Sequence, residues 1–569
     1  MTRKYQLGLL LVLIGAAIFY FWHLGRPDII TDEASHAVRA IGMVDFDFGI
    51  EQPTPWQWVE RVPGWMRLSF HDHPIMLFLA EHVSIRAFGE TPFAVRLPSA
   101  LAGIASVWLL YLIGRRLYSP AVGFGASALF AVTVNHVWIS RIGLFESLAV
   151  AFMLAAFWAF LRGLRQKSFF ALAALFLGLA VLTKYTALIL LPIFLTILLI
   201  RRRDLLVTKT TLVAAFLFLL VASPIVIYNI QLYRAFGHFD FQFSQLFGQD
   251  VKEWQARPGQ EVLGSYAERV RTFVPRLIES NSPYFLSAGA AGLGLVAFEL
   301  IRRRRASGAA APDHLPLAAA IAWLIPFLVF IGPAHRFLAL LTPWLAIAAG
   351  YAIATIIYSN ILKNIGINTT AVFVAAAAAI PALEAAYAYN SVVALQPVGP
   401  RPWTHAAIHR QTGSWGFNEL EDNLASALAG KMPDPAISFQ FQFARDILAD
   451  ARARGIEQRL RPVPLGIVYN DNINLAAQLW IFLRRITYHG WPVMSAENFR
   501  NGGREFLLAS GVREILFVNA TTAALQDRPR PPTQDGDLLE DKLTSAGAKP
   551  VEIKNPKGEV AFRIYLAPL

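Results

Sequence analysis

The strongest constraint on this 569-residue chain is a series of long apolar segments that fill its first 390 residues. We expect eleven of them to cross a bilayer, since each approaches the roughly 20 residues that a membrane-spanning helix needs. The predicted spans are 5–22, 93–114, 121–139, 145–161, 168–183, 185–200, 210–230, 283–301, 315–333, 337–358 and 369–389. Because 55% of the residues are hydrophobic and only 16% are charged, the sequence predicts a polytopic α-helical membrane protein with about 11–13 transmembrane helices.

Short basic runs between the apolar segments predict how the chain is threaded. They fall on alternate connections: Arg115-Arg116, Arg162–Lys167, Arg201–Arg203, Arg302–Arg305 and Lys363. The positive-inside rule places all of them in the cytoplasm. The net charge of +12 is thereby explained by topology, and we expect no nucleic-acid partner. The outer loops 23–92 and 231–282, and everything after about residue 390, are then expected on the extracytoplasmic side, as in a bacterial plasma membrane.

One apolar segment, residues 75–88, is too short to span a bilayer and contains Glu81, His82 and Arg86. If it crossed the membrane, every later basic run would move to the outer side. We therefore expect this segment to form a helix in the outer membrane interface. The transmembrane domain is predicted to extend over residues 1–390.

The last 180 or so residues have a different character, since their apolar runs shorten to the length of strands. Strands are predicted at 464–469, 491–494 and 514–519, helices at 472–488 and 504–510, and a closing hairpin over 551–566. This alternation predicts a soluble α/β domain over residues 391–569. Gly466 is not part of a Gly-x-Gly-x-x-Gly fingerprint, so a nucleotide site is not indicated. A supporting or acceptor-docking role is our hypothesis for this domain.

Polar residues gather where the outer connections meet the membrane. The acidic pair Asp32–Glu33 follows the first span by ten residues, and the run His71-Asp72-His73 comes about forty residues later. Other charged residues stand at outward turns or span ends: Arg141, Glu146, Lys184 and Arg336. Because all of them reach the same membrane face in the predicted topology, they indicate a site at the boundary of water and lipid. On spacing alone, ordinary loop acids near the headgroups explain the pair equally well.

Several local patterns together resemble one family. They are Thr31-Asp-Glu33, Asp72-His-Pro74, Phe88-Gly89, Phe93–Pro98, Arg141–Glu146, Thr183-Lys-Tyr185 and His335-Arg-Phe337. Their order over roughly residues 1–350 resembles the GT-C fold glycosyltransferases that use polyprenyl-phosphate sugars, of the protein O-mannosyltransferase and aminoarabinose (lipid A) transferase kind. The resemblance implies a donor sugar on undecaprenyl or dolichyl phosphate. It also implies an acceptor hydroxyl or phosphate on the outer face, carried by a protein, a lipid or a glycan.

The acidic residues suit such a transfer, because a carboxylate can take the proton of the acceptor. In the family the first acid of the pair is catalytic, so Asp32 is predicted as the general base. Glu33 is predicted as its catalytic neighbour, whose repulsion raises one pKa of the pair. By the resemblance, Glu146 is an acid that faces the donor sugar. The alternatives are a helix cap for Asp32 and a favourable acid at a helix N-terminus for Glu146.

The basic residues are predicted to hold the phosphate as its charge grows. Lys184 and Arg336 are the first candidates, with snorkelling of the side chain to the surface as the alternative. Arg141 is equally well explained as an interface anchor or as a phosphate contact. In some family members a lysine that contacts the phosphate precedes Pro74, but this chain has His73 there. His73 is therefore predicted to donate to the phosphate, and the role of the family's lysine is in doubt.

A divalent metal is a weaker expectation. His71, Asp72 and His73 offer nitrogen and oxygen ligands that suit zinc or manganese. Adjacent residues rarely all reach one ion, so no cofactor is required by the sequence. The chain has no cysteine, which excludes disulfides, thiol catalysis and cysteine-ligated metal sites.

Two other classes of protein are alternatives to a membrane glycosyltransferase. A transporter or flippase of lipid-linked glycans should show polar residues at the bilayer midplane, often in inverted repeats. A non-enzymatic assembly protein would not need paired acids in its first outer loop. The aromatic residues of loop 231–282 predict either an interfacial belt or a lid over the site. The sequence identifies neither the sugar nor the acceptor.

Overall fold

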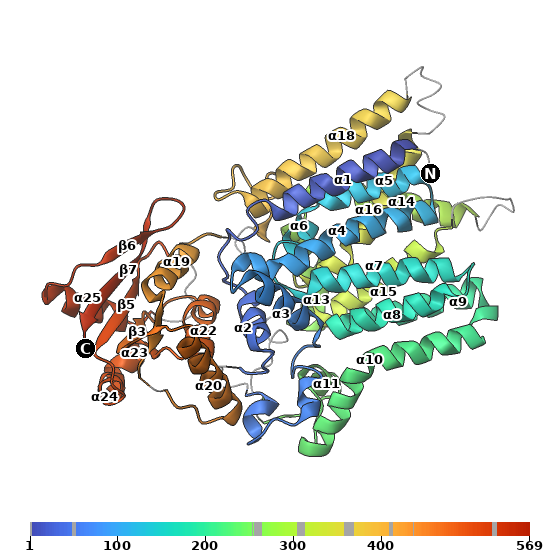
Figure 1. Cartoon of the computed structure of the whole chain (residues 1–569). Helices are drawn as coiled ribbons and strands as arrows, with labels where there is room; N and C mark the ends of the chain where they lie inside the picture. The colour runs from blue at the N-terminus through green and yellow to red at the C-terminus, as the bar shows by residue number, and fades with distance from the viewer. Residues whose placement is uncertain are drawn as a thin grey trace.

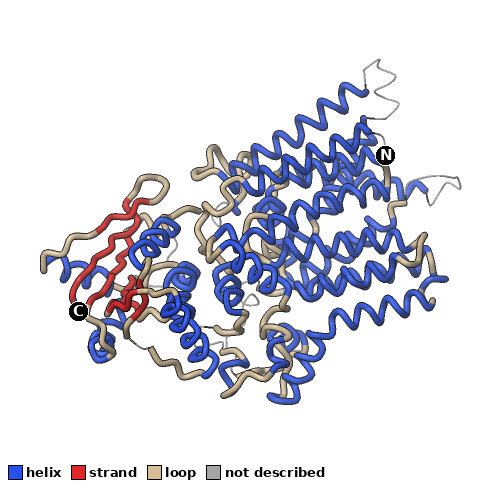
Figure 2. Tube along the Cα trace, viewed as in Figure 1, coloured by secondary structure: helices blue, strands red, loops and turns tan. Residues whose placement is uncertain are grey.

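A computed structural model gives the structure of the chain and describes residues 3–47, 53–252, 254, 264–303, 313–357, 369–408, 413–435, 437–525 and 532–569. The helices of the first 390 residues form a bundle, and the strands lie together beyond one end of it (Figures 1 and 2). The amino terminus lies at the opposite end of the bundle (Figure 1). The predicted class, an apolar helical protein with a C-terminal sheet, is confirmed.

Each of the eleven predicted spans falls on helical residues. Four helices are long and apolar enough to cross a membrane: α4 (Pro92–Leu117), α7 (Phe145–Gly163), α10 (Lys209–Phe236) and α14 (Pro283–Arg303). Four other predicted spans are each formed by a single helix: α1 (Arg3–Phe21), α8 (Phe169–Thr183), α15 (Leu315–Ile331) and α18 (Thr369–Ala388). α7 is the most enclosed of the four long helices and α10 the most exposed. This difference places the start of α7, with Glu146, in the interior of the protein.

Three predicted spans are not single helices. The span 121–139 is broken at Thr133, whose ψ of 131° ends α5 (Pro120–Val132) before α6 (Val134–Ile139) begins. The other two begin with a 3₁₀ turn: η3 (Tyr185–Ile189) precedes α9 (Leu190–Arg201), and η5 (Phe337–Leu340) precedes α16 (Thr342–Ile357). Lys184 and Arg336 are the residues that begin these two turns. Both cations therefore stand where a regular helix is interrupted.

The predicted first outer loop contains the short helices α2 (Glu33–Gly42), η1 (Pro55–Trp58), η2 (Gly64–Arg67) and α3 (Met76–Phe88). Of these, α2 and α3 lie between the bundle and the sheet (Figure 1). α3 has 13 residues, a rise of about 20 Å, which is less than the roughly 30 Å of a hydrocarbon core. Its interfacial position stays a prediction. Helices α11 (Phe241–Leu246) and α13 (Tyr266–Ser280) belong to the second outer loop.

The C-terminal part contains the predicted strands and the closing hairpin. Its five-stranded sheet has the order β4-β3-β5-β7-β6, in which β3 is parallel to β4 and β5, and β7 is antiparallel to β5 and β6. The strands are β3 (Leu465–Tyr469), β4 (Val493–Ser495), β5 (Glu514–Ala520), β6 (Val551–Lys554) and β7 (Val560–Pro568). All five residues of β3 are buried, as expected of a central strand that is covered on both faces.

Helices pack around this sheet, and a separate parallel pair is formed by β1 (Lys431–Pro433) and β2 (Arg461–Val463). The helices are α19 (Phe417–Leu428), α20 (Gln442–Glu457), α22 (Arg484–His489), α24 (Arg504–Ala509) and α25 (Asp535–Ser545). The predicted helix 472–488 is divided into α21 (Leu475–Gln478), a π-helical turn (Leu479–Leu483) and α22. Further short segments are η4 (Arg203–Leu205), η6 (Tyr389–Val393), α23 (Ala496–Asn498) and η9 (Phe499–Gly503).

The C-terminal part and the first outer loop share one hydrophobic core. This core brings Ala34 and Ala37 of α2 into the same buried cluster as Phe417 of α19 and Phe482 of the π-helical turn before α22. Residues of α3 and the first turn of α7 belong to it as well. The sheet is therefore packed against the bundle through α2, the helix that Asp32 precedes.

Candidate active site

Four of the predicted site residues come together in one cluster of charges. Arg336 Nη1 donates to Asp32 Oδ2, and Lys184 Nζ donates to Glu146 Oε1. The ring of Phe337 lies near both cations, with Lys184 Nζ 4.5 Å and Arg336 Cζ 5.3 Å from its centroid, within the range of cation–π attraction. The cluster contains two negative and two positive side chains, so it is neutral as a whole.

The two ion pairs lie at different depths. The side chains of Asp32 and Arg336 are 60% and 33% exposed, whereas those of Glu146 and Lys184 are 2% and 11% exposed. Glu146 Oε2 is buried and has no hydrogen-bond partner among the described residues. A buried acceptor without a donor is unusual in a folded protein. Glu146 Oε2 is therefore able to accept a hydrogen bond from a ligand.

Asp32 directs its carboxylate toward the cluster and not toward its own helix. It is the N-cap residue of α2 but makes no side-chain capping hydrogen bond. Desolvation is the largest influence and raises the pKa of Asp32, but the combined effect of Arg336, His36 and His73 holds the pKa below its ordinary value. The pKa of Asp32 is therefore not the one that repulsion within the pair would raise, because the two carboxylates face different partners.

Glu33 and Arg141 point into the protein and bond to groups outside the charged cluster. Glu33 is 1% exposed and accepts hydrogen bonds from Arg96 Nε (3.0 Å), Arg96 Nη2 (2.6 Å) and the Gly143 N–H (2.9 Å). Arg141 donates to the carbonyl oxygens of Phe19 (2.7 Å) and Tyr20 (2.9 Å), as basic side chains do at helix C-termini. The structure does not bring these two residues to the charged cluster.

Aromatic rings adjoin the cluster on the side of His73. The imidazole of His73 stacks on Phe145, with 4.4 Å between ring centroids, and the ring of His36 meets Phe145 edge-on at 4.6 Å. Burial and the nearby charge of His73 lower the pKa of His36 to about 3, so this imidazole is neutral at physiological pH. Sequence analysis missed His36. Its position one helical turn after Asp32 was the available signal.

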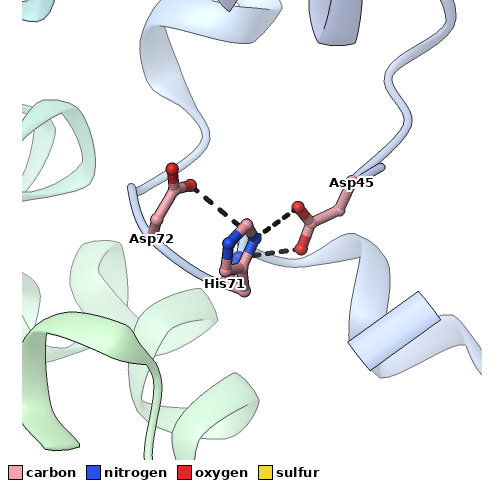
Figure 3. Close-up of side chains that lie close together, drawn as sticks. All are labelled: Asp45, His71 and Asp72. Carbon is pink, nitrogen blue, oxygen red and sulfur yellow. Dashed lines mark hydrogen bonds and ion pairs between the residues drawn. The ribbon is translucent and has the colours of Figure 1, made fainter. Parts of the chain in front are cut away.

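Of the metal candidates predicted from adjacent residues, His71 and Asp72 lie in one group with Asp45 (Figure 3). Asp45, His71 and Asp72 each offer a ligand atom within 4.8 Å of the others. His73 stacks on Phe145, and its Nδ1 lies 3.3 Å from Asp72 Oδ2. His71 donates its backbone N–H to Asp45 (2.8 Å), and its Nδ1 lies 2.7 Å from the same carboxylate. Asp45 was not predicted, since 26 residues separate it from His71.

The three residues do not fit a metal ion as they are arranged. Donor atoms around a tetrahedral zinc ion lie roughly 3.3 Å apart, whereas His71 Nδ1 and Asp45 Oδ1 are at hydrogen-bond distance, 2.7 Å. Arg39 Nη1 already contacts both oxygens of Asp72 at 2.9 Å. Burial alone would lower the pKa of His71, but Asp45 and Asp72 outweigh it and raise the pKa. The carboxylates of Asp45 and Asp72 therefore already have partners, in His71 and Arg39.

The second outer loop packs on the His71–Asp72 segment. The backbone N–H of Phe241 donates to His71 O (2.8 Å), and Gln242 Nε2 donates to Asp72 O (3.2 Å). Asp240 fixes the start of α11 by accepting hydrogen bonds from Tyr185 Oη (2.6 Å) and the Phe243 N–H (2.9 Å). Residues 253 and 255–263 of the predicted lid or belt lie outside the described residues. Both interpretations of this loop stay predictions.

Comparisons with known proteins agree with the fold. Residues 72–228 match the model of the family described as dolichyl-phosphate-mannose-protein mannosyltransferase. The chain is 28% identical over 235 residues to "Putative mannosyltransferase YkcB" of Bacillus subtilis, covering 40% of this chain and 31% of that protein. It is 27% identical over 171 residues to "Putative mannosyltransferase YycA" of the same organism, covering 29% and 23%. The chain thus matches about a third or less of the length of these relatives.

Solved structures extend the similarity to nearly the whole chain. The apo structure of ArnT from Cupriavidus metallidurans superposes with a TM-score of 0.50 and 13% identity, covering 98% of this chain and 97% of ArnT. The structure of the same protein bound to undecaprenyl phosphate gives the same score and coverage. At this identity the superposition shows the fold alone. The chain therefore has the GT-C fold, and its residues 72–228 match the model of the dolichyl-phosphate-mannose-protein mannosyltransferase family.

Proposed function

We propose that this protein is a membrane glycosyltransferase that moves a sugar from a polyprenyl-phosphate donor to a hydroxyl or phosphate acceptor at the outer membrane face. The observation that carries the proposal is the cluster in which Asp32 pairs with Arg336 and Glu146 with Lys184. It combines a partly exposed carboxylate with two cations beside one aromatic ring. Three comparisons support a lipid-linked donor. Residues 72–228 match a dolichyl-phosphate-mannose family model, the relatives are named as putative mannosyltransferases, and ArnT has been solved bound to undecaprenyl phosphate.

In the proposed reaction the phosphate of the donor binds between Lys184 and Arg336. Because Arg336 is paired with Asp32 before the donor arrives, the phosphate competes for the guanidinium and releases the carboxylate. Asp32 then takes the proton of the acceptor hydroxyl as the acceptor oxygen bonds to the anomeric carbon. The bond between that carbon and the phosphate oxygen breaks, and both cations stabilise the lipid phosphate that leaves. Glu146 Oε2 accepts a hydrogen bond from the donor sugar.

The location of the cluster favours an enzyme over a transporter. The four side chains come from the segment before α2, the first turn of α7 and the residues that begin η3 and η5. α2 and α3 lie between the bundle and the sheet (Figure 1), and the cluster sits next to them. A transporter would be expected to gather such residues at the midplane of the bilayer.

Reconstitution of the purified protein with radiolabelled lipid-linked sugars and a panel of acceptors tests the proposal. Asp32→Asn is expected to abolish transfer while the protein stays folded and inserted, and Glu146→Gln to reduce the rate strongly. Turnover of Asp32→Asn near the wild-type rate would refute the assignment of the base. An unchanged rate of Glu146→Gln would return this acid to a role at the helix N-terminus.

The phosphate contacts are tested by Lys184→Ala and Arg336→Ala. A charge-assisted hydrogen bond contributes roughly 1.5–3 kcal/mol, so each variant should raise the KM for the donor by about ten- to a hundredfold. The KM for the acceptor should change less. Arg86→Ala is the matched control, because Arg86 is an exposed cation of α3 and should leave both constants unchanged. Equal effects of Lys184→Ala on both substrates would indicate a folding defect and contradict the phosphate assignment.

A further inference from the structure

We propose that the C-terminal sheet domain positions the catalytic acid, because it clamps the loop that leads to Asp32 through Asp28 and Asn418. This inference rests on the proposed function, since it assumes that Asp32 is the base. It gives the C-terminal domain a role inside the active site, in addition to any contact with an acceptor. Asp28 and Asn418 are positioning residues, because neither of them reaches the charged cluster.

The first half of the clamp is the carboxylate of Asp28. This side chain is 1% exposed and accepts the backbone N–H groups of Trp415 (2.5 Å), Phe417 (3.3 Å) and Asn418 (2.9 Å). These donors lie at the start of α19, where the first N–H groups of a helix have no partner within the helix. Asp28 therefore acts as the cap of a helix about 390 residues away in the sequence.

The second half of the clamp is the side-chain amide of Asn418. Its Nδ2 donates to three successive carbonyl oxygens of the same loop: Gly25 (3.3 Å), Arg26 (2.8 Å) and Pro27 (3.3 Å). The Asp28 N–H donates to the carbonyl oxygen of Gly413 (3.1 Å). The loop and the C-terminal segment thus satisfy each other's backbone groups in both directions.

The bundle holds the opposite side of this loop. Arg96 of α4 donates to the carbonyl oxygens of Leu24 (3.0 Å), Pro27 (2.8 Å) and Asp28 (3.1 Å). The same guanidinium forms the buried ion pair with Glu33. The backbone that precedes Asp32 is therefore held by hydrogen bonds from both the bundle and the C-terminal domain.

The C-terminal domain also holds the far end of α2. The hydroxyl of Tyr488 donates to Val38 O (2.6 Å). A Cβ atom at Gly42 would lie 2.6 Å from the Tyr488 ring, so the backbone and the ring are in close contact. α2 has only ten residues, and a helix this short is marginal without tertiary contacts. Its position therefore depends on what packs against it.

The position of α2 matters for catalysis because Asp32 directly precedes this helix. Asp32 is 60% exposed and is held by its ion pair with Arg336, which the donor phosphate takes over in the proposed reaction. From that moment the position of the base is set by the backbone of α2 and its preceding loop. A displacement of about 1 Å at a catalytic group can reduce a rate by about a hundredfold.

The test compares Asn418→Ala with a matched control at the same domain boundary. Asn418→Ala removes the side-chain amide, and with it all three contacts to the carbonyl oxygens of the loop, and adds no charge. We expect kcat to fall about ten- to a hundredfold with little change in the donor KM, because Lys184 and Arg336 do not lie on this loop. The control is His489→Ala, which removes the contact of His489 with Glu90 (3.1 Å) and should leave kcat unchanged. An unchanged kcat in folded Asn418→Ala would overturn the proposal.

Amide hydrogen exchange of residues 24–36, measured without substrate, is a readout that does not depend on activity. Asn418→Ala should accelerate exchange in this segment, and His489→Ala should not. Unchanged exchange in Asn418→Ala would refute the clamp. If Asp32→Asn stays active, the proposed function fails, while the exchange result still decides whether the clamp exists.

Discussion

The adjacent acids Asp32 and Glu33 should respond to substitution in opposite ways. We expect Asp32→Asn to abolish transfer with little effect on stability, and Glu33→Gln to destabilise the protein. The reason is the environment of each ion pair. Asp32 and Arg336 are 60% and 33% exposed, and pairs at such sites contribute about 0–1 kcal/mol. Glu33 and Arg96 are 1% and 2% exposed, and removing one partner of a buried pair costs about 3–5 kcal/mol.

The hydrogen bonds of Glu33 refine this magnitude. Its carboxylate accepts two bonds from Arg96 and one from the Gly143 N–H. A glutamine keeps the size of the side chain and one acceptor oxygen, so the cost should lie near the lower end, about 3 kcal/mol. The double variant Glu33→Gln/Arg96→Met should cost less than the sum of the two single variants, because neither charge is then left unpaired.

Thermal and denaturant unfolding of the detergent-solubilised protein, followed by the fluorescence of its 14 tryptophans, measures the difference. Transfer assays on the same samples give the rates. The reasoning would be refuted if Asp32→Asn destabilised the protein as much as Glu33→Gln. It would also be refuted if Glu33→Gln lost its activity with unchanged stability, since Glu33 would then act in the reaction and not in the support of the loop.

Two further predictions concern the His71 network and the topology. Because the pKa of His71 is raised in the folded state, its contribution to stability is complete below the unfolded pKa near 6.5 and is lost as the pH rises through the folded pKa. Asp45→Asn should remove this dependence in unfolding curves measured from pH 5 to 9; an unchanged dependence would exclude His71 as its source. For the topology, a single cysteine at Val207 (83% exposed) should react with impermeant thiol reagents only from the cytoplasm, and one at Val398 (75% exposed) only from outside. The reverse pattern at either position would contradict the predicted orientation.

Local patterns in the sequence were sufficient for much of the fold. Each predicted span is helical, because the apolar character of a segment is a property of its own residues. The strand predicted at 464–469 is β3, since a short, fully apolar run between turn residues suits a buried central strand. The broken spans are the exceptions. The interruptions at the starts of η3 and η5 coincide with Lys184 and Arg336, whereas the break at Thr133 has no such charged residue.

The types of the site residues were also predictable, and four of them meet as expected. Asp32, Glu146, Lys184 and Arg336 form one cluster, because outward span ends in the same topology converge on one face. The sequence could not separate Asp32 from Glu33. Neighbouring residues at the start of a helix point in different directions, and only the packing of α4 showed that Glu33 faces Arg96.

The sequence by itself determined which segments are apolar helices, which are strands, and which residue types could carry the chemistry, since these properties depend on near neighbours in the chain. The tertiary structure alone decided the partners. It joined Arg336 to Asp32 across 304 residues, brought Asp45 beside His71, and placed Asn418 on the loop before Asp32, the proposed catalytic acid. Such contacts depend on how whole helices pack, and a pairing between distant residues leaves no periodic signal in either segment.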